Sequence, residues 1–182
     1  MSDNRFADHP DLERCIEFHG HFCPGLTTGY RAARIGMSRL GAARSEDEEL
    51  IAIVENDACG IDAIQVLTGC TFGKGNLIYR DYGKHVYTFA LRPSGRAVRI
   101  SRRTAAPSRD GRQEMSRDET IQHMLTAPDE ELFEIRELTI DLPSTARIRQ
   151  SVTCDACGEA VMETRTRTVN GRTLCIPCAE PR

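Results

Sequence analysis

The residues best suited to chemistry are crowded into one short stretch, residues 18–25, with the sequence FHGHFCPG. The imidazoles of His19 and His21 and the thiol of Cys23 fall within five residues of one another. Imidazole and thiolate are soft ligands that suit zinc, iron, nickel or copper(I). The Pro-Gly pair that follows fixes one backbone angle and frees the next. The stretch is therefore interpreted as a rigid loop that presents metal ligands.

A helix is predicted directly after this loop. Apolar residues recur at helical spacing, which predicts a buried amphipathic helix over residues 26–40 that ends at Gly41. The loop would then hold Cys23 at a helix N-terminus, where the helix dipole favours the thiolate. The alternative interpretation is that His19 and His21 are capping or core histidines and that Cys23 is a small buried hydrophobic residue.

A second thiol is expected in an equivalent place. Residues 50–54 form an apolar run that predicts a buried strand, and Asp57 and Cys59 follow it, just before a helix predicted over residues 61–67. Two thiols are thus expected at two helix starts. The candidate catalytic residues are Cys23, Cys59 and Asp57, and the candidate ligands of a core metal, zinc, iron or nickel, are His19, His21, Cys23 and Cys59.

The elements that must position these residues indicate an α+β fold, in which a mixed sheet packs with helices. We expect a helix over residues 11–18, a β-hairpin of residues 77–79 and 85–91, strands at 97–100 and 133–140, and a helix from the capping box at 116–119 to residue 125. The core domain is assigned to residues 1–143, with residues 1–10 as a loose arm, and residues 144–153 are assigned to a linker.

The C-terminal segment, residues 154–182, carries the clearest metal pattern in the sequence. Two Cys-x-x-Cys pairs are separated by 17 residues and can surround one tetrahedral zinc ion with four thiolates, those of Cys154, Cys157, Cys175 and Cys178. Such a closed site leaves no position for substrate, so we expect a structural zinc finger. An Asn-Gly turn at residues 170–171 predicts a hairpin between the pairs.

Composition and charge narrow the class of protein. The chain has 182 residues and a net charge of −3, and no apolar run reaches the roughly 18 residues of a membrane span. We expect a cytoplasmic protein whose eight cysteines bind metal and do not form disulfides. An arginine-rich block at residues 92–117 lacks aromatic residues to stack on bases and is followed by an acidic block, so nucleic acid is a disfavoured partner.

Three ordered motifs resemble the FmdE family, which takes its name from a component of formylmethanofuran dehydrogenase. They are HGHFCPG at residues 19–25, DACGIDAIQ at 57–65 and GCTFGKGNL at 69–77. The resemblance runs over residues 18–140 and implies an α+β core, a homodimer and, in some members, a C-terminal treble-clef zinc finger. Only residues 179–182 follow the last cysteine, so the helix that completes a treble clef would be a stub. The resemblance also implies a link to the molybdenum- or tungsten-dependent formylmethanofuran dehydrogenase of methanogenesis.

Three functions follow for the structure to weigh. The first is a metal-binding accessory protein of molybdenum or tungsten enzyme metabolism, with a His/Cys site in the core and structural zinc in the finger. The second is a metal- or thiol-dependent enzyme acting on a formyl or amide-like substrate. The third is a zinc-finger regulator that binds a protein partner or nucleic acid. An open, concave site would favour the second over a closed ligand shell.

Overall fold

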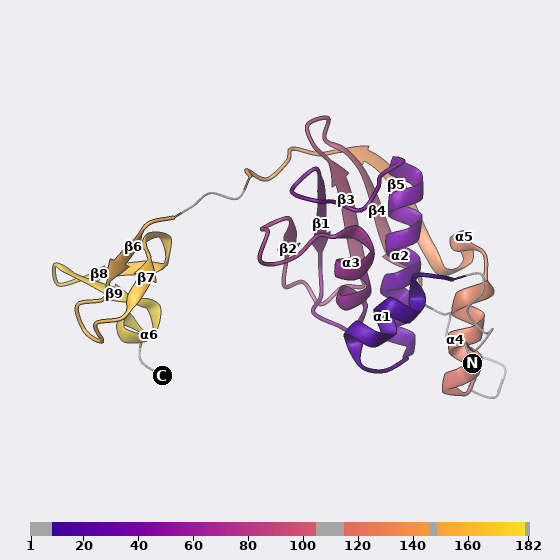
Figure 1. Ribbon diagram of the computed structural model, residues 1–182, viewed down its shortest axis with the longest axis horizontal. Coiled ribbons are helices and arrows are strands. Elements are labelled where there is room, and N and C mark those ends of the chain that lie inside the picture. Colours follow the sequence, from indigo (N-terminus) through magenta and orange to yellow (C-terminus); the bar gives the residue numbers. More distant parts are fainter. Residues whose placement is uncertain (1–8, 105–114, 146–148, 181–182) are drawn as a thin grey trace. The chain divides into compact units, whose positions relative to one another are not determined.

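The computed structural model describes residues 9–104, 115–145 and 149–180 (Figure 1). Most of the predicted N-terminal arm, the middle of the arginine-rich block, part of the predicted linker and the last two residues lie outside the described residues. The chain divides into two compact units, residues 1–145 and residues 146–182. Each unit contains one of the two cysteine-bearing motifs, so each is described by itself.

The first unit is built on a five-stranded sheet. Its strands are β1 (Leu50–Val54), β2 (Leu77–Tyr79), β3 (Val86–Leu91), β4 (Arg96–Arg102) and β5 (Phe133–Thr139), in the order β2-β1-β3-β4-β5. The β1–β2 pair is parallel, and the other neighbours are antiparallel. All five residues of β1 are buried, as expected of a central apolar strand. The predicted mixed sheet is therefore confirmed.

Helices α1, α2 and α3 lie together against this sheet (Figure 1). The helices of this unit are α1 (Leu12–His19), α2 (Pro24–Leu40), α3 (Gly60–Thr68), α4 (Arg117–Thr126) and α5 (Asp129–Leu132). The predicted capping box is present, with the Ser116 hydroxyl accepting from the Glu119 N–H and the Glu119 carboxylate accepting from the Ser116 N–H. Within the described ranges, no helix is both long and apolar enough to cross a membrane.

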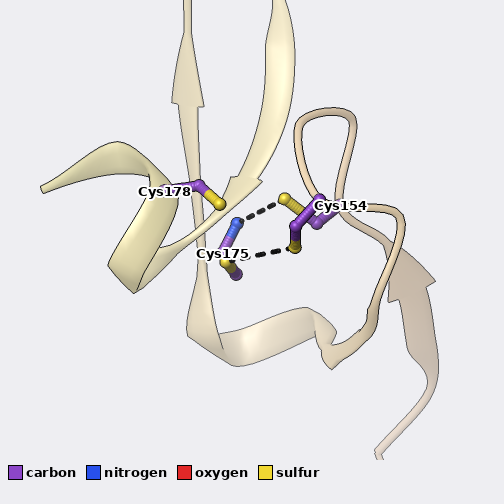
Figure 2. A group of neighbouring side chains, drawn as sticks. Cys154, Cys175 and Cys178 are labelled. Atoms are coloured by element: carbon purple, nitrogen blue, oxygen red, sulfur yellow. Dashed lines mark hydrogen bonds between the residues drawn. The ribbon is translucent and has the colours of Figure 1, made fainter. Parts of the chain in front are cut away.

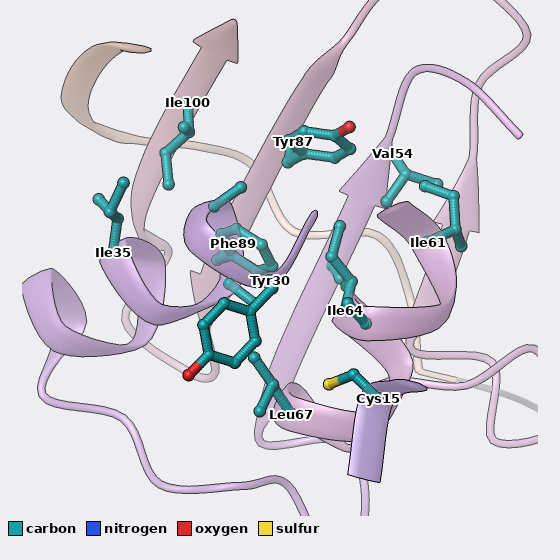
Figure 3. Packing of buried hydrophobic residues seen from close by; sticks show 14 of the residues in the cluster. Cys15, Tyr30, Ile35, Val54, Ile61, Ile64, Leu67, Tyr87, Phe89 and Ile100 are labelled. Carbon is teal, nitrogen blue, oxygen red and sulfur yellow. The ribbon is translucent and has the colours of Figure 1, made fainter. Parts of the chain in front are cut away.

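The core fills the space between the helices and the sheet (Figure 3). Tyr30 from α2, Ile64 from α3 and Phe89 from β3 are among its fully buried side chains. A Cβ atom placed on Gly36 would lie 2.2 Å from the Phe89 ring, so α2 approaches the sheet closely because this position has no side chain. This packing holds the N-terminal end of α2, where Cys23 lies, in a fixed position.

The predicted β-hairpin of residues 77–79 and 85–91 is wrong, although both strands exist. β1 lies between them, and Ile53 pairs with Ile78 on one side and with Thr88 on the other. The connection between β2 and β3 passes the end of β1, where the Arg80 N–H donates to the Val54 carbonyl at 2.8 Å. An apolar strand in the middle of a sheet pairs its backbone groups on both edges, and this satisfies more buried groups than a separate hairpin.

The second unit contains two short hairpins and a short helix. Its elements are β6 (Ser151–Thr153), β7 (Ala160–Met162), the 3-10 helix η2 (Glu163–Arg165), β8 (Thr166–Val169), β9 (Arg172–Cys175) and α6 (Ile176–Ala179). Asn170 and Gly171 both have positive φ, 50° and 77°, as the predicted turn between β8 and β9 requires. The four-residue α6 agrees with the expected helical stub.

Candidate metal centres

The four cysteines of the second unit form a compact group (Figure 2). The sulfur atoms of Cys154, Cys157, Cys175 and Cys178 all lie within 4.8 Å of one another. The Cys157 and Cys175 sulfurs are 3.9 Å apart. A tetrahedral zinc ion with Zn–S bonds of about 2.3 Å separates its sulfur ligands by about 3.8 Å. The donor set and its spacing therefore fit zinc.

Backbone hydrogen bonds shape this group for thiolates. Backbone N–H groups of Cys157, Cys175 and Ala156 hold the pKa of the Cys154 thiol at about 6. The Cys175 N–H donates to the Cys154 sulfur at 3.3 Å. Asp155 joins the two Cys-x-x-Cys segments, because its carboxylate accepts from the Thr173 N–H at 2.6 Å. The finger therefore presents at least one of its sulfurs in the form that binds metal.

The first unit contains a second group of potential ligands. The ligand atoms of His19, His21 and Cys23 all lie within 4.8 Å of one another. His19 is the last residue of α1, and Gly20 ends that helix with a φ of 88°. Cys23 is the N-cap of α2, where its sulfur accepts from the Leu26 N–H at 3.3 Å. The tight turn between two helices therefore brings the three side chains together.

Asp62 completes this group and was not predicted from the sequence. Its carboxylate oxygen lies 2.6 Å from Nδ1 of His19. When Nδ1 carries the proton and donates to Asp62, Nε2 presents its lone pair on the side of Cys23, whose sulfur is 3.9 Å away. Carboxylates commonly orient metal-binding histidines in this way. The available signal was the place of Asp62 in the first turn of α3, three residues after Cys59.

Cys59 approaches Cys23 because the helix starts meet through glycines. A Cβ atom on Gly29 would lie 1.9 Å from the Gly60 carbonyl oxygen, so the backbones of α2 and α3 are in contact. A Cβ atom on Gly25 would lie 3.6 Å from the Cys59 sulfur and 3.8 Å from the Cys23 sulfur. Burial, and after it the Cys23 thiol, raises the pKa of Cys59. Cys59 thus adjoins the His19, His21 and Cys23 group without being one of its members.

An open cavity of about 380 Å³ adjoins this group. His19, Asp62 and Cys59 line it, and so does Asp57, whose residue is exposed. Phe72, which is 66% exposed, and Tyr79 contribute aromatic surface. Pockets of roughly this size or larger hold small ligands in proteins. The candidate catalytic residues Asp57 and Cys59 therefore share a concave surface, whereas Cys23 is 8% exposed and adjoins it.

Comparisons with known proteins place both units. Residues 18–134 match the family described as "FmdE, Molybdenum formylmethanofuran dehydrogenase operon". Residues 147–182 match the prokaryotic dksA/traR C4-type zinc finger. A crystal structure of an FmdE-like protein of tungsten formylmethanofuran dehydrogenase, from Syntrophus aciditrophicus, has the same fold, with a TM-score of 0.69 at 23% identity, over 95% of this chain and 93% of that one.

A curated relative adds a different description. A protein of Archaeoglobus fulgidus named "Probable S-adenosyl-L-methionine-binding protein" is 34% identical over 195 residues, which cover 92% of this chain and 52% of that protein. The chain thus spans about half the length of the curated relative. The FmdE match covers the loop with His19 and Cys23, both thiol-bearing helix starts and most of the sheet. With its C4-type zinc finger, the chain belongs to the FmdE family.

Proposed function

We propose that this chain is a metal-binding accessory protein of molybdenum or tungsten enzyme metabolism, with an open His/Cys metal site in its core. The observation that carries the proposal is the group of His19, His21 and Cys23, whose ligand atoms lie within 4.8 Å of one another. The family's printed description connects it to the formylmethanofuran dehydrogenase operon, which supports the enzyme class.

The donor set suits a transition metal that remains accessible. Three protein ligands with an open fourth position are typical of reactive zinc sites, whereas four ligands are typical of structural ones. Asp62 fixes the His19 ring, and the N-cap position of α2 holds the Cys23 sulfur close to a backbone N–H. A bound metal would supply Lewis acidity. His21 is exposed and Cys23 is buried, so the group connects the interior to the surface.

The finger has a structural role in this proposal. We assign the core to residues 1–143, the linker to 144–153 and the finger to 154–182. Four thiolates close the zinc coordination shell, so the finger metal holds its fold and does not bind substrate. The small apolar cluster of Cys154, Leu174 and Cys175 is the buried core of this unit, which supports a dependence on metal.

Metal analysis of the full chain tests the proposal. The purified protein should contain metal in both sites, and Cys23→Ser should lose the core metal while Cys157→Ser loses only the finger zinc. Cys70→Ser is the matched control, because this buried thiol donates to the Leu50 carbonyl at 3.3 Å, away from both groups, and a hydroxyl keeps that bond. The proposal fails if Cys23→Ser and Cys70→Ser contain the same metal as the wild type.

The open cavity favours a second candidate, a metal- or thiol-dependent enzyme acting on a formyl or amide-like substrate. Cys59 would serve as the nucleophile, or His19 and Asp57 would move protons, on the wall of the 380 Å³ cavity. The name of the Archaeoglobus relative adds S-adenosyl-L-methionine as a ligand to test. Calorimetric titration with that compound and with N-formyl amines, in wild type and Cys59→Ser, decides between a catalytic site and a metal-handling one.

The remaining parts of the proposal concern assembly. We assign a homodimer, a cytoplasmic location and a molybdenum or tungsten enzyme as partner. The FmdE match supports the partner. Sedimentation of the purified chain measures the oligomeric state, and a monomer at micromolar concentration would remove the dimer.

A further inference from the structure

A second, larger cavity adjoins the one at the core metal group. Its volume is about 500 Å³, and its lining includes Arg14, Glu17, Phe18 and Arg44. The two cavities share Gln65 of α3. They also divide neighbouring residues between them: Phe18 and Thr71 line the larger cavity, and the next residues, His19 and Phe72, line the smaller one. The two cavities are thus neighbouring parts of one surface along α1, α3 and the loop after α3.

The chemistry of the two cavities differs. The smaller one carries an imidazole, a thiol and carboxylates, which are groups that bind metal or transfer protons. The larger one carries two guanidinium groups against the single carboxylate of Glu17. Arginine presents several N–H donors in a planar fork that matches a carboxylate or a phosphate. A ligand that lies across both would therefore meet reactive groups at one end and cationic donors at the other.

Both arginines keep donors for a ligand. Arg44 donates from Nε to the Val66 carbonyl at 3.1 Å, which fixes its side chain against α3 and uses one of its five N–H donors. Arg14 donates from one terminal nitrogen to Asp11 at 3.3 Å, and both partners are more than half exposed. Such an exposed ion pair contributes little and exchanges readily for a ligand. Arg14 and Arg44 also line a third cavity together, so the two side chains lie close to each other.

We propose that the two cavities bind one elongated small molecule, with its carboxylate or phosphate at Arg14 and Arg44 and its reactive end at His19 and Cys59. The assignment of the reactive end rests on the proposed function. Gln65, at the junction, supplies an amide that can donate to or accept from the middle of the molecule. Phe18, which is 59% exposed, offers an aromatic surface to its apolar part.

The first test uses a chemical probe for both ends. A series of ω-mercaptocarboxylates places a thiol, which binds soft metals, at one end and a carboxylate at the other, and the ω-mercaptoalcohols of equal length lack the charge. In the full chain, the acid of optimal length should bind about tenfold or more tighter than its alcohol, as measured by calorimetry. The double variant Arg14→Gln with Arg44→Gln should lose this preference. Arg136→Gln is the control, because Arg136 is similarly exposed and also pairs with a carboxylate.

Equal binding of acid and alcohol by the wild type, or a preference that survives the double variant, would overturn the proposal. The second test separates it from the proposed function, since inorganic phosphate needs no metal. Phosphate should shift the side-chain Nε–H resonances of Arg14 and Arg44 in the wild type and equally in Cys23→Ser. If Cys23→Ser still contains all its metal, the metal proposal fails while these shifts stand. If phosphate moves neither arginine resonance, the anion site is wrong whatever the metal content.

Discussion

The finger and the core group both gather soft ligands, but they are built in different ways. In the finger, all four ligands are cysteines of two Cys-x-x-Cys pairs, and their own hairpins bring them together. In the core, His19 and Cys23 lie at the ends of two helices, and Asp62 and Cys59 come from a third. The finger depends on the metal for its shape, whereas the core group depends on a hydrophobic domain that folds around it.

This difference teaches where chemistry can happen. A closed set of four thiolates satisfies its metal and leaves no position for another ligand. The core group combines two imidazoles and a thiol with an open cavity of about 380 Å³. The same chain thus holds one metal site suited to stability and one suited to exchange or reaction.

Metal removal should separate the two units most strongly. A chelator that strips the finger should unfold residues 149–180, because structural zinc supplies on the order of 10 kcal/mol of folding free energy in such units. The core should stay folded, since its buried cluster contains many apolar residues from helices and strands. Amide resonances in the two units, followed during chelation, measure this. A finger that keeps its dispersed resonances without metal would contradict the comparison.

A glycine substitution should damage the core group through packing. In Gly29→Ala, the new methyl group would lie 1.9 Å from the Gly60 carbonyl, so α2 and α3 must move apart. Overpacking of this kind costs roughly 3 kcal/mol. The urea midpoint should fall accordingly, and the Cys23 and Cys59 thiols should separate.

Gly73→Ala is the control for this packing change, because a Cβ atom there meets no atom within 4 Å. It should change stability by less than about 0.5 kcal/mol. If the two variants unfold at the same urea concentration, close helix contact is not what joins the two thiols.

Removal of the orienting carboxylate should weaken the core metal alone. Asp62→Asn keeps the size of the side chain but removes the charge that holds the His19 ring at 2.6 Å. Loss of such a partner typically lowers metal affinity about 10- to 100-fold. Competition with a chromophoric chelator measures the affinity of the core, and zinc content of the finger should be unchanged.

Asp57→Asn serves as the comparison for Asp62→Asn, since Asp57 lines the same cavity and is exposed. Its effect on metal affinity should be smaller. An equal loss in both variants would mean that general negative charge, and not a specific contact with His19, supports the site.

Patterns within a short stretch of sequence predicted most local structure. The spacing of Cys154 and Cys157, the capping box at Ser116 and the helix start at Cys23 each depend on residues a few positions apart. Backbone geometry and hydrogen bonds at that range follow from residue type. The finger and both thiol-bearing helices could therefore be predicted before the fold was known.

Contacts between distant segments could not be predicted in this way. The parallel pairing of β2 with β1 depends on the sheet order, which the loop sequence between β2 and β3 does not specify. Asp62 meets His19 from 43 positions away because α1 packs on α3. Arg31 likewise reaches from α2 to the end of α4, where it donates to the Met124, Leu125 and Ala127 carbonyls. Such pairs are decided by tertiary packing, which one sequence does not display.

The smallest effect concerns a loop that a carboxylate organises, much as metal would organise the finger. Glu49 accepts from the backbone N–H groups of Glu46 at 2.9 Å and Asp47 at 2.8 Å, and from the Ser45 hydroxyl at 2.9 Å. The backbone N–H of Glu49 itself, then these groups, hold the pKa of its carboxyl at about 2. The folded pKa is below the unfolded value of about 4.3, so this contribution to stability is present above about pH 4.3 and is lost as the pH falls toward 2.

Glu49→Gln should therefore unfold at a lower urea concentration than the wild type at pH 7, and the difference should shrink between pH 4.3 and pH 2. Glu46→Gln is the control, since Glu46 contributes its backbone N–H and carbonyl to this loop. A constant difference over this pH range would mean that the Glu49 charge has no part in the loop. A difference that closes with acid would show that the core, unlike the finger, holds its connections by ordinary hydrogen bonds to a side chain of its own.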